Sequence, residues 1–400
     1  MDALTTPLNW QRVRLGDIAE IIGGGTPSTQ ITSFWNGSIN WFTPTEIGIT
    51  KYVYKSQRTI TLLGLKKSSA KLLPIGTILL TSRASIGDCA ILKVVATTNQ
   101  GFQSLIPLEK INNEFLYYLM LTLKNKLLKL ASGSTFLEVS PNKIKNLLIP
   151  LPPLDEQIAI ANILSGLDRY LYSLDALILK KESVKKALSF ELLSQRKRLK
   201  GFNQNWQRVR LGTYKYRRGS FPQPYGNPQW YSDNGMPFVQ VYDVGENFKL
   251  NQKTKQKISK IAQPMSVFVP KNSVIITLQG TIGRVALTQY DCYCDRTILI
   301  FDNNTLNDVN KYFFVLSLFT KFEEEKRKAD GSIIKTITKQ TLKDFEILLP
   351  PLNEQIAIAN ILSGLDSEII SLKNKKRQFE NIKKALNHDL MSAKIRVLKK

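Results

Sequence analysis

The chain has 400 residues, 43% of them hydrophobic, and a formal net charge of +24 at pH 7. This length suffices for two or three domains with separate cores, and the basic excess favours a polyanionic partner such as nucleic acid. The basic residues are spread along both halves, so a basic tail does not explain the charge. Three cysteines and the single histidine, His388, exclude a disulfide framework, a His-based catalytic triad and a His-rich metal cluster.

Membrane and secretory signals are not seen in the sequence. No apolar run approaches the length of about 18 residues that a membrane span needs. Residues 1–10 show no basic region followed by an apolar stretch. We therefore expect a cytoplasmic protein that does not associate with membranes. We also expect no metal site and no cofactor, with Cys89, Cys292 and Cys294 serving as ordinary thiols near strand ends.

Two copies of about 200 residues make up the chain. Residues 151–168 read LPPLDEQIAIANILSGLD and residues 349–366 read LPPLNEQIAIANILSGLD, so they differ only at Asp155 and Asn353. NWQRVRLG at 9–16 recurs unchanged at 205–212, whereas 21–42 and 214–239 share little. One constant scaffold with two divergent surfaces indicates a protein that docks two copies of one partner and recognises two different targets.

Each copy begins with a module of mixed secondary structure. β-rich runs at 76–81, 273–277 and 297–301 predict strands, and clusters of turn-forming residues at 23–25 and 231–235 predict turns. Apolar periodicity predicts helices at 113–130 and 308–328. Each module is therefore expected to be α/β with an antiparallel or mixed sheet.

Each copy ends with a long predicted helix. Paired prolines at 152–153 and 350–351 prevent an earlier start, Asp155 or Asn353 can cap the first turn, and nothing interrupts either helix until about Lys200 or Lys400. A coiled-coil seam with central lysines is predicted at Leu164, Leu167, Leu171, Leu174, Ile178, Lys181, Lys185, Leu188 and Leu192, and at Leu362, Leu365, Ile369, Leu372, Lys376, Phe379, Lys383, Leu386 and Leu390.

The fold class expected from these elements is α+β, with two mixed α/β modules separated by two long antiparallel coiled-coil helices. Such packing would relate the modules by an approximate twofold axis. It would also bring the end of the second helix near residue 1, so that the chain closes into a pseudo-circle.

The motifs in this order resemble the specificity subunit of type I restriction-modification enzymes. They are the PLPPLxEQxxIAxILSxLD pattern, the WQRVRLGD strand, GGTPS, WNGSINWFTPTEI, TSRASIGDCAI, TNQGF and GST, and the resemblance covers essentially the whole chain. It implies target-recognition domains at 1–150 and 201–348, which read the two halves of a bipartite DNA site. It implies spacer helices at 151–200 and 349–400, two modification (methyltransferase) subunits as partners, and restriction subunits in the full complex.

Candidate DNA contacts are polar residues in the predicted loops, because arginine reads guanine, asparagine and glutamine read adenine, and small polar groups hold phosphates. In the first module they are Gly25, Thr26, Ser28, Thr43, Thr45, Arg83, Ser85, Asn99 and Gln100. In the second they are Arg217, Arg218, Ser220, Gln223, Gln240, Tyr242, Gln279, Thr281, Arg284 and Arg296. YRRGSFPQPYG replaces GGGTPST in the second module, so equivalent loops need not make equivalent base contacts. Trp35, Trp41 and Trp230 are expected to anchor the core or loops.

The predicted partner socket is the helical face that carries small residues and is repeated in both copies: Ile158, Ala159, Asn162, Ile356, Ala357 and Asn360. We predict no catalytic residue, because the sequence has no phosphate-binding loop, no Asn-Pro-Pro-Tyr-type run and no dinucleotide fingerprint. The acidic run at 323–325 is expected to be a solvated helix face.

Two other functions fit parts of the sequence. A free-standing regulator could read a bipartite DNA site unaided, although it would not need a duplicated partner socket. A coiled-coil scaffold could bind proteins alone, although the charge of +24 argues for nucleic acid.

Overall fold

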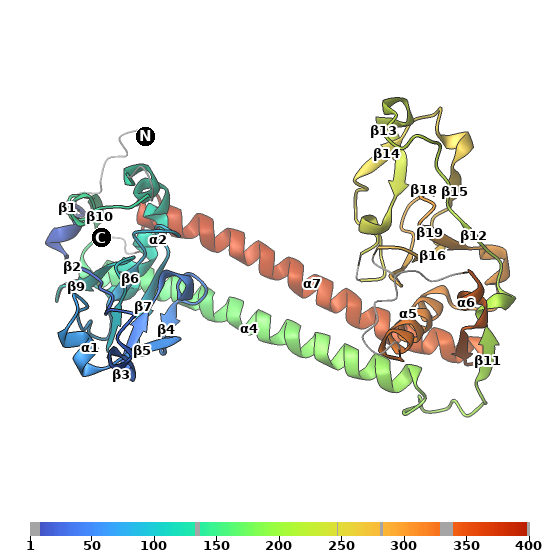
Figure 1. Cartoon of the computed structure of the whole chain (residues 1–400), viewed down its shortest axis with the longest axis horizontal. Coiled ribbons are helices and arrows are strands. Elements are labelled where there is room, and N and C mark those ends of the chain that lie inside the picture. The colour runs from blue at the N-terminus through green and yellow to red at the C-terminus, as the bar shows by residue number, and fades with distance from the viewer. Residues whose placement is uncertain (1–8, 133–136, 246, 281–282, 329–338, 398–400) are drawn as a thin grey trace. The chain divides into compact units, whose positions relative to one another are not determined.

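The computed structural model describes residues 9–132, 137–245, 247–280, 283–328 and 339–397 (Figure 1). The chain divides into two compact units: unit 1 comprises residues 1–176 and 373–400, and unit 2 comprises residues 177–372. Each unit contains one mixed module, part of the helix that follows this module, and part of the other long helix. Unit 1 is therefore discontinuous in sequence.

The module of unit 1 is built on a five-stranded sheet of order β2-β9-β6-β7-β4 and a three-stranded sheet of order β5-β3-β8. Pairing is antiparallel except between β4 and β7 and between β3 and β8. The strands are β2 (Ala19–Gly23), β3 (Trp35–Phe42), β4 (Tyr52–Val53), β5 (Arg58–Ile60), β6 (Ile78–Leu80), β7 (Cys89–Leu92), β8 (Ala96–Thr98) and β9 (Gln103–Pro107). The helices are α1 (Leu62–Lys66), α2 (Asn113–Leu130) and α3 (Pro141–Lys145). The mixed sheet and the helix at 113–130 are thus confirmed.

The module of unit 2 has two four-stranded sheets, of order β12-β19-β16-β17 and β14-β13-β18-β15. The strands are β12 (Tyr216–Arg218), β13 (Tyr231–Val239), β14 (Gln256–Ile258), β15 (Val267–Val269), β16 (Val274–Thr277), β17 (Val285–Leu287), β18 (Cys292–Cys294) and β19 (Ile298–Phe301). The helices are α5 (Lys311–Lys328) and α6 (Lys339–Asp344). Helix α5 thus begins three residues after the predicted start at 308.

The predicted turn at 231–235 is wrong, because these residues lie inside β13. Tyr231 and Met236 are both paired with Ile258 on β14, so the four polar or small residues between them form an irregular bulge. A bulge and a turn share the same residue preferences, which explains the error.

Each module's helix buries one face against its sheet. Phe115, Tyr118 and Leu119 of α2 are at most 1% exposed and join the main core of unit 1. Phe313, Phe314 and Leu318 of α5 are fully buried in the main core of unit 2. Burial of such large side chains supplies most of the driving force that fixes each module's helix on its sheet.

The long helices are α4 (Leu154–Leu193) and α7 (Leu352–Met391). Each begins one residue before the predicted cap, and the Asp155 or Asn353 side chain accepts a hydrogen bond from the next amide at 2.9 Å. The expected ends near Lys200 and Lys400 are wrong. Gln195 and Ala393 each adopt a φ of +58°, in the left-handed region that terminates helices.

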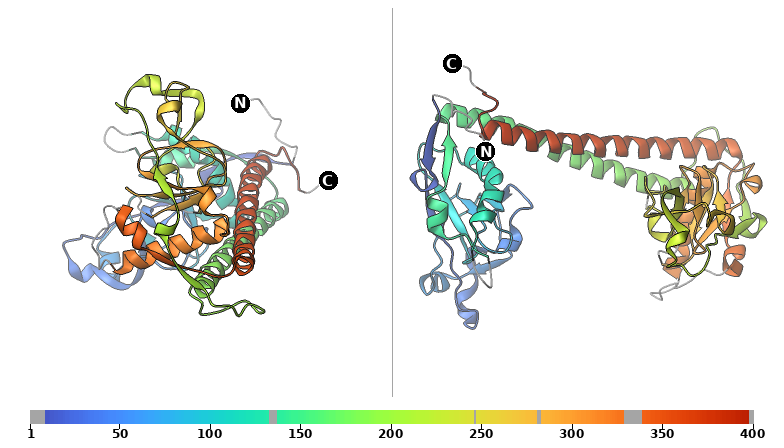
Figure 2. Two further views of the ribbon diagram at one scale, coloured as in Figure 1. Left: turned by 90° about the vertical axis from the view of Figure 1, so that its right-hand side faces the viewer. Right: turned by 90° about the horizontal axis from the view of Figure 1, so that it is seen from above.

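Segments of α4 and α7 run side by side in each unit, and the contacts between them are antiparallel (Figure 2). In unit 1, Lys376 pairs with Asp175 at 2.6 Å, and Lys383 pairs with Asp168. In unit 2, Lys181 pairs with Glu368 at 2.8 Å, and Lys185 pairs with Asp366. Every predicted seam position is buried or half-buried. The seam lysines thus face acids on the opposite helix, which fixes the register of each pair.

A small two-stranded sheet joins each module to its helix. It pairs β1 (Gln11–Arg14) with β10 (Leu148–Leu151) in unit 1, and β11 (Gln207–Arg210) with β20 (Glu346–Leu349) in unit 2. In unit 1, Arg396 donates a 3.0 Å hydrogen bond to the side chain of Asn9. The end of the second helix therefore lies beside the start of the described chain, as predicted.

Candidate DNA-reading loops and docking face

A glycine-rich loop lies against a polar turn in unit 1. The loop follows β2, and the turn at 99–101 joins β8 to β9. A Cβ atom on Gly24 would lie 1.9 Å from the carbonyl oxygen of Asn99, so this approach requires glycine. The Thr26 hydroxyl donates a hydrogen bond to the Gln100 side chain. Four predicted DNA contacts, Gly25, Thr26, Asn99 and Gln100, are thereby brought together.

Two tryptophans hold this loop in place. The Trp41 indole donates to the carbonyl of Gly25 at 2.8 Å, and the Trp35 indole donates to the carbonyl of Ser28 at 3.0 Å. The guanidinium of Arg58 lies 3.8 Å from the Trp35 ring centroid. Because both tryptophans are less than 10% exposed, they anchor the loop, as predicted, and offer no stacking surface.

A second loop, after β3, reaches the same turn. The Thr43 amide and hydroxyl donate to Glu46 at 2.7 and 2.8 Å, and the Thr43 hydroxyl lies 3.0 Å from that of Thr45. A Cβ atom on Gly101 would lie 2.8 Å from Cγ of Pro44. The predicted contacts Thr43 and Thr45 therefore sit beside the 99–101 turn.

The hairpin between β6 and β7 carries the last two predicted contacts of the first module. The Ser82 amide donates to the Gly101 carbonyl at 2.8 Å, which ties the hairpin to the same turn. Arg83 forms a 2.8 Å ion pair with Glu138, and its side chain is 42% exposed. Ser85 is half-buried, and its carbonyl accepts from a threonine hydroxyl. All nine predicted residues of this module thus lie on three loops and on the turn that connects them.

Unit 2 repeats the glycine approach despite its different sequence. A Cβ atom on Gly219 would lie 2.2 Å from the carbonyl oxygen of Cys294 and 2.3 Å from that of Asp295. On the same turn, the guanidinium of exposed Arg296 lies 5.2 Å from the ring centroid of Tyr225. The replacement of GGGTPST therefore changes the side chains while keeping the backbone contact.

The other loops of unit 2 also have counterparts in unit 1. The Gln240 amide donates to Asp243 at 2.9 Å, and the Tyr242 hydroxyl donates to the Gln240 side chain. Gln279 is exposed in the turn after β16. Thr281 lies outside the described residues. Equivalent strand pairing and hairpin hydrogen bonds match Thr43 with Gln240, Thr45 with Tyr242, Arg83 with Gln279, and Gln100 with Arg296.

Some predicted residues of the second module already bind its own backbone. Arg217, Ser220 and Arg284 donate to carbonyls at 3.1, 2.9 and 3.1 Å. Arg218 and Gln223 are exposed, and Gln223 precedes a cis peptide bond to Pro224. Trp230 is half-buried against an aromatic cluster around Phe221.

A buried carboxylate fastens each module to its helix, a role that the sequence reasoning missed. The Glu156 side chain of α4 is 3% exposed. It accepts a hydrogen bond from the Trp10 indole at 3.0 Å and another from Arg396 at 2.8 Å. The neighbouring Gln157 accepts from the Asn112 amide at 3.0 Å, at the start of α2.

Unit 2 contains the same arrangement. We call each buried glutamate, together with its tryptophan and arginine donors, the latch. Glu354, 1% exposed, accepts from the Trp206 indole at 3.1 Å and from Arg198 at 2.7 Å. Gln355 accepts from the Asn310 amide at 2.9 Å. The identity of the EQ dipeptide in both copies was the available signal, and burial shows that these two residues serve the fold.

The opposite face of each helix start points to solvent. Ile158 and Ile356 are 40% and 41% exposed, and Leu154 and Leu352 are each 42% exposed. Asn162 and Asn360 are exposed, whereas Ala159 and Ala357 are half-buried. A Cβ atom on Gly166 or Gly364 would have no neighbour within 4 Å. We call this repeated surface, formed by the Leu, Ile, Ala and Asn residues named here, the docking face.

A family model described as the type I restriction modification DNA specificity domain matches residues 7–181 and 223–381. The chain belongs to this family. The MjaIX specificity subunit of Methanocaldococcus jannaschii, a type I restriction enzyme subunit, is 28% identical over 98% of this chain and 94% of its own length. The EcoR124I/EcoR124II specificity subunit of Escherichia coli is 36% identical, over 38% of this chain and 40% of its own.

Solved structures of type I specificity subunits share the fold. The S subunit from M. genitalium matches with a TM-score of 0.60 at 17% identity, covering 97% of both chains. The HsdS subunit from Thermoanaerobacter tengcongensis matches with a TM-score of 0.55 at 20% identity, covering 99% of this chain and all of its own. The resemblance inferred from the sequence motifs is confirmed.

In this member of the specificity-domain family, a charged cluster lies where the module of unit 1 meets α4. The Lys51 ammonium pairs with Glu114, lies 3.9 Å from Asp168, and donates to Tyr118 and Ser165 at 2.8 and 2.9 Å. Burial lowers the pKa of Lys51 from its usual value, while Glu114 opposes the shift. The cluster adds a polar contact between module and helix beside the apolar core.

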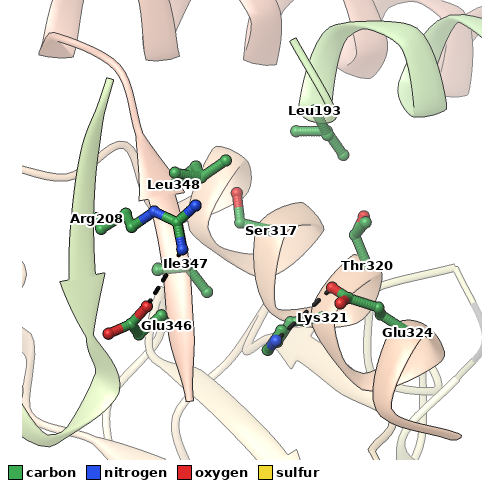
Figure 3. Close-up of a pocket in the computed structure, with 9 residues that line it drawn as sticks. All are labelled: Leu193, Arg208, Ser317, Thr320, Lys321, Glu324, Glu346, Ile347 and Leu348. Atoms are coloured by element: carbon green, nitrogen blue, oxygen red, sulfur yellow. Dashed lines mark ion pairs between the residues drawn. The ribbon is translucent and has the colours of Figure 1, made fainter. Parts of the chain in front are cut away.

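Two pockets lie at corresponding positions in the modules of unit 1 and unit 2. The one in unit 2 has a volume of about 270 Å³ and is lined by Arg208 of β11, Glu346 of β20, and Lys321 and Glu324 of α5, among others (Figure 3). The one in unit 1 is lined by Lys126 and Leu148, at the positions of Glu324 and Glu346. Because the charges differ between the copies, these pockets do not form one repeated ligand site.

No helix in the described part of the chain is long and apolar enough to span a membrane. Within the same residues, no group of three or more His, Cys, Asp or Glu side chains could hold a metal ion. In the acidic run at 323–325, Glu323 forms an exposed ion pair with Lys326, whereas Glu325 forms a half-buried one with Lys321.

Proposed function

We propose that this chain is the non-catalytic DNA-recognition subunit of a type I restriction-modification system. Residues 1–150 read one half of a split double-stranded site and residues 201–348 read the other. The segments 151–200 and 349–400 connect the readers and bind two modification subunits, with restriction subunits joining in the full complex. The observation that carries the proposal is one loop scaffold that presents different side chains at matched positions in the two modules.

The matched positions differ in hydrogen-bonding chemistry. Gln100 can donate to and accept from adenine, whereas Arg296 at the same place donates two hydrogen bonds to guanine. Arg83 and Gln279 show the reverse exchange. Two modules with one backbone and exchanged side chains suit two different half-sites. The net charge of +24 supplies the phosphate attraction that does not depend on sequence.

The docking face suits a repeated protein partner. Its leucines and isoleucines are about 40% exposed in both copies, and Gly166 and Gly364, further along the helices, have no neighbour within 4 Å of a Cβ position. Ile158, Ala159 and Asn162 in the first copy, and Ile356, Ala357 and Asn360 in the second, would each contact one modification subunit.

The experiment is single-molecule mapping of methylated adenines in cells that carry this gene with its modification partner. We expect a split motif that disappears with the gene. Arg296→Ala should relax the motif in one half only, with a loss of about 1–3 kcal/mol at the base contacted. Methylation independent of sequence would refute the proposal, as would tight binding to the site by the chain alone with no response to modification subunits.

The matched control is Arg217→Ala. This arginine is exposed on the same module but donates to a backbone carbonyl at 3.1 Å. It should leave the motif unchanged if reading is confined to the loops joined to the turn at 295–297, between β18 and β19.

A further inference from the structure

The strand sequence QRVR is identical in β1 and β11, although most of it faces solvent. In each strand the glutamine and both arginines are exposed, and the valine is half-buried. Val13 and Val209 pack against the two cores, which explains why the valine is kept. The fold gives no corresponding reason for keeping the three exposed side chains.

Ion pairs within the chain do not explain the arginines. In unit 2, Arg208 and Arg210 lie 3.6 and 3.4 Å from Glu346, with side chains 76% and 70% exposed. In unit 1 the corresponding partner position is Leu148, which is directly paired with Arg14. An acid is therefore present beside one strand and replaced by leucine beside the other, while the arginines are the same.

The strands lie next to the docking face. In unit 1, Gln11 is paired with Leu151, and two prolines then lead into α4 at Leu154. Leu154 and Ile158 form the exposed apolar part of the face. Unit 2 repeats the arrangement, because Gln207 is paired with the last residue of β20 before α7 begins.

The glycine-rich loop of unit 1 leaves the far end of β2, in the five-stranded sheet, whereas β1 belongs to the two-stranded sheet with β10. Strand β2 begins at Ala19, shortly after β1, and its far end at Gly23 leads into the glycine-rich loop. Five extended residues span about 16 Å. The arginines of β1 thus lie on the strand that pairs with the segment leading into Leu154 and Ile158, exposed apolar side chains that DNA phosphates do not bind and a protein surface does.

We propose that Arg12 and Arg14 in unit 1, and Arg208 and Arg210 in unit 2, form a basic rim of the docking face. They bind acidic side chains on each of two identical partner subunits, around an apolar contact with the leucines and isoleucines. This inference rests on the proposed function and adds the charge of the partner surface. It predicts that the modification subunit presents an apolar patch bordered by Asp or Glu.

The test uses the full chain and the modification subunit of the same system. Arg12→Ala with Arg14→Ala should weaken one of the two docking events about tenfold, because it removes two exposed ion pairs that each contribute a few-fold in affinity. Arg208→Ala with Arg210→Ala should weaken the other, and the four changes together should weaken both. Native mass spectrometry and sedimentation give the stoichiometry and affinity at low and high salt.

Two control variants test whether an effect on docking comes from the charge of the rim arginines or from any loss of positive charge. Lys66→Ala with Lys67→Ala removes two exposed charges from the end of α1 and should leave docking unchanged. Arg12→Lys with Arg14→Lys keeps the charge and should retain most of the affinity. All substituted side chains are exposed, so the urea unfolding midpoints should match the parent chain.

DNA binding, measured in parallel, decides between partners. Weakened docking with unchanged DNA affinity would support the inference. Unchanged docking with DNA affinity reduced equally on all sequences would assign the arginines to phosphates and overturn it, as would no change in either measurement. A parent chain that binds DNA but no modification subunit would refute the proposed function itself, and the inference with it.

Discussion

The buried latch makes the sharpest prediction about stability. Glu156→Ala removes a carboxylate that is 3% exposed, leaves the Trp10 indole without its acceptor, and leaves the Arg396 guanidinium without its counter-charge, although Arg396 keeps its hydrogen bond to Asn9. Breaking a buried ion pair typically costs about 3–5 kcal/mol, and a lost hydrogen bond about 1 kcal/mol. Because the arginine side chain is 30% exposed, water compensates part of the loss. We expect a loss of about 3 kcal/mol in the unfolding free energy of unit 1.

The assay must resolve the two units, because the latch is local to each. Hydrogen exchange measured by mass spectrometry should show faster exchange in the module of unit 1 and in residues 373–397, with unit 2 unchanged. Glu354→Ala should give the reciprocal pattern in unit 2. Glu380→Ala, at a carboxylate that is 50% exposed, is the matched control and should change stability by less than about 0.5 kcal/mol.

Equal loosening of both units by Glu156→Ala would refute this reasoning, because the latch would then act through the whole chain. An unfolding free energy unchanged by either substitution would show that the carboxylates contribute nothing net. In that case the identity of the EQ dipeptide in the two copies would need a different cause.

The geometry of unit 1 supports three further predictions. Gly24→Ala should displace the turn at Asn99, since the new methyl would lie 1.9 Å from a carbonyl oxygen, and should abolish reading of one half-site while methylation mapping still shows the other. Burial raises the pKa of the Cys89 thiol to about 12, so iodoacetamide at pH 8 should label it only after unfolding; rapid labelling of the native chain would contradict its placement. Burial lowers the pKa of Lys51 below 10.5, so between its folded and unfolded values the unfolded chain binds more protons and stability rises with pH. The urea midpoint of the parent chain relative to that of Lys51→Met should therefore rise with pH below 10.5, because the ionisable groups common to both chains largely cancel.

The repeat made much of the fold predictable. Strict spacing of three and four residues located the helix seam, and the paired prolines located the helix starts to within one residue. The helix ends were missed because Gln195 and Ala393 terminate the helices without glycine or proline. Local preferences do not mark such positions, because neither glutamine nor alanine favours the left-handed conformation by itself.

The sequence predicted which loops carry the candidate site. It did not predict which residues on those loops bind the protein's own backbone. Asn99 and Gln100 belong to a turn that only the folded sheet brings against Gly24, and sequence order gave no sign of that contact. Arg284 is of a residue type that commonly contacts bases, yet its side chain donates a hydrogen bond to a main-chain carbonyl at 3.1 Å. Polarity identifies candidate residues, whereas packing decides which of them face outward.

The discontinuity of unit 1 has a consequence for synthesis. Unit 2 is continuous from 177 to 372 and is complete before the last residues leave the ribosome. Unit 1 must wait for residues 373–400, because Arg396 supplies the second partner of Glu156. The segment made first is therefore the last to finish folding. A nascent chain truncated before Arg396 would hold a mature second module and a first module whose buried carboxylate still lacks its counter-charge.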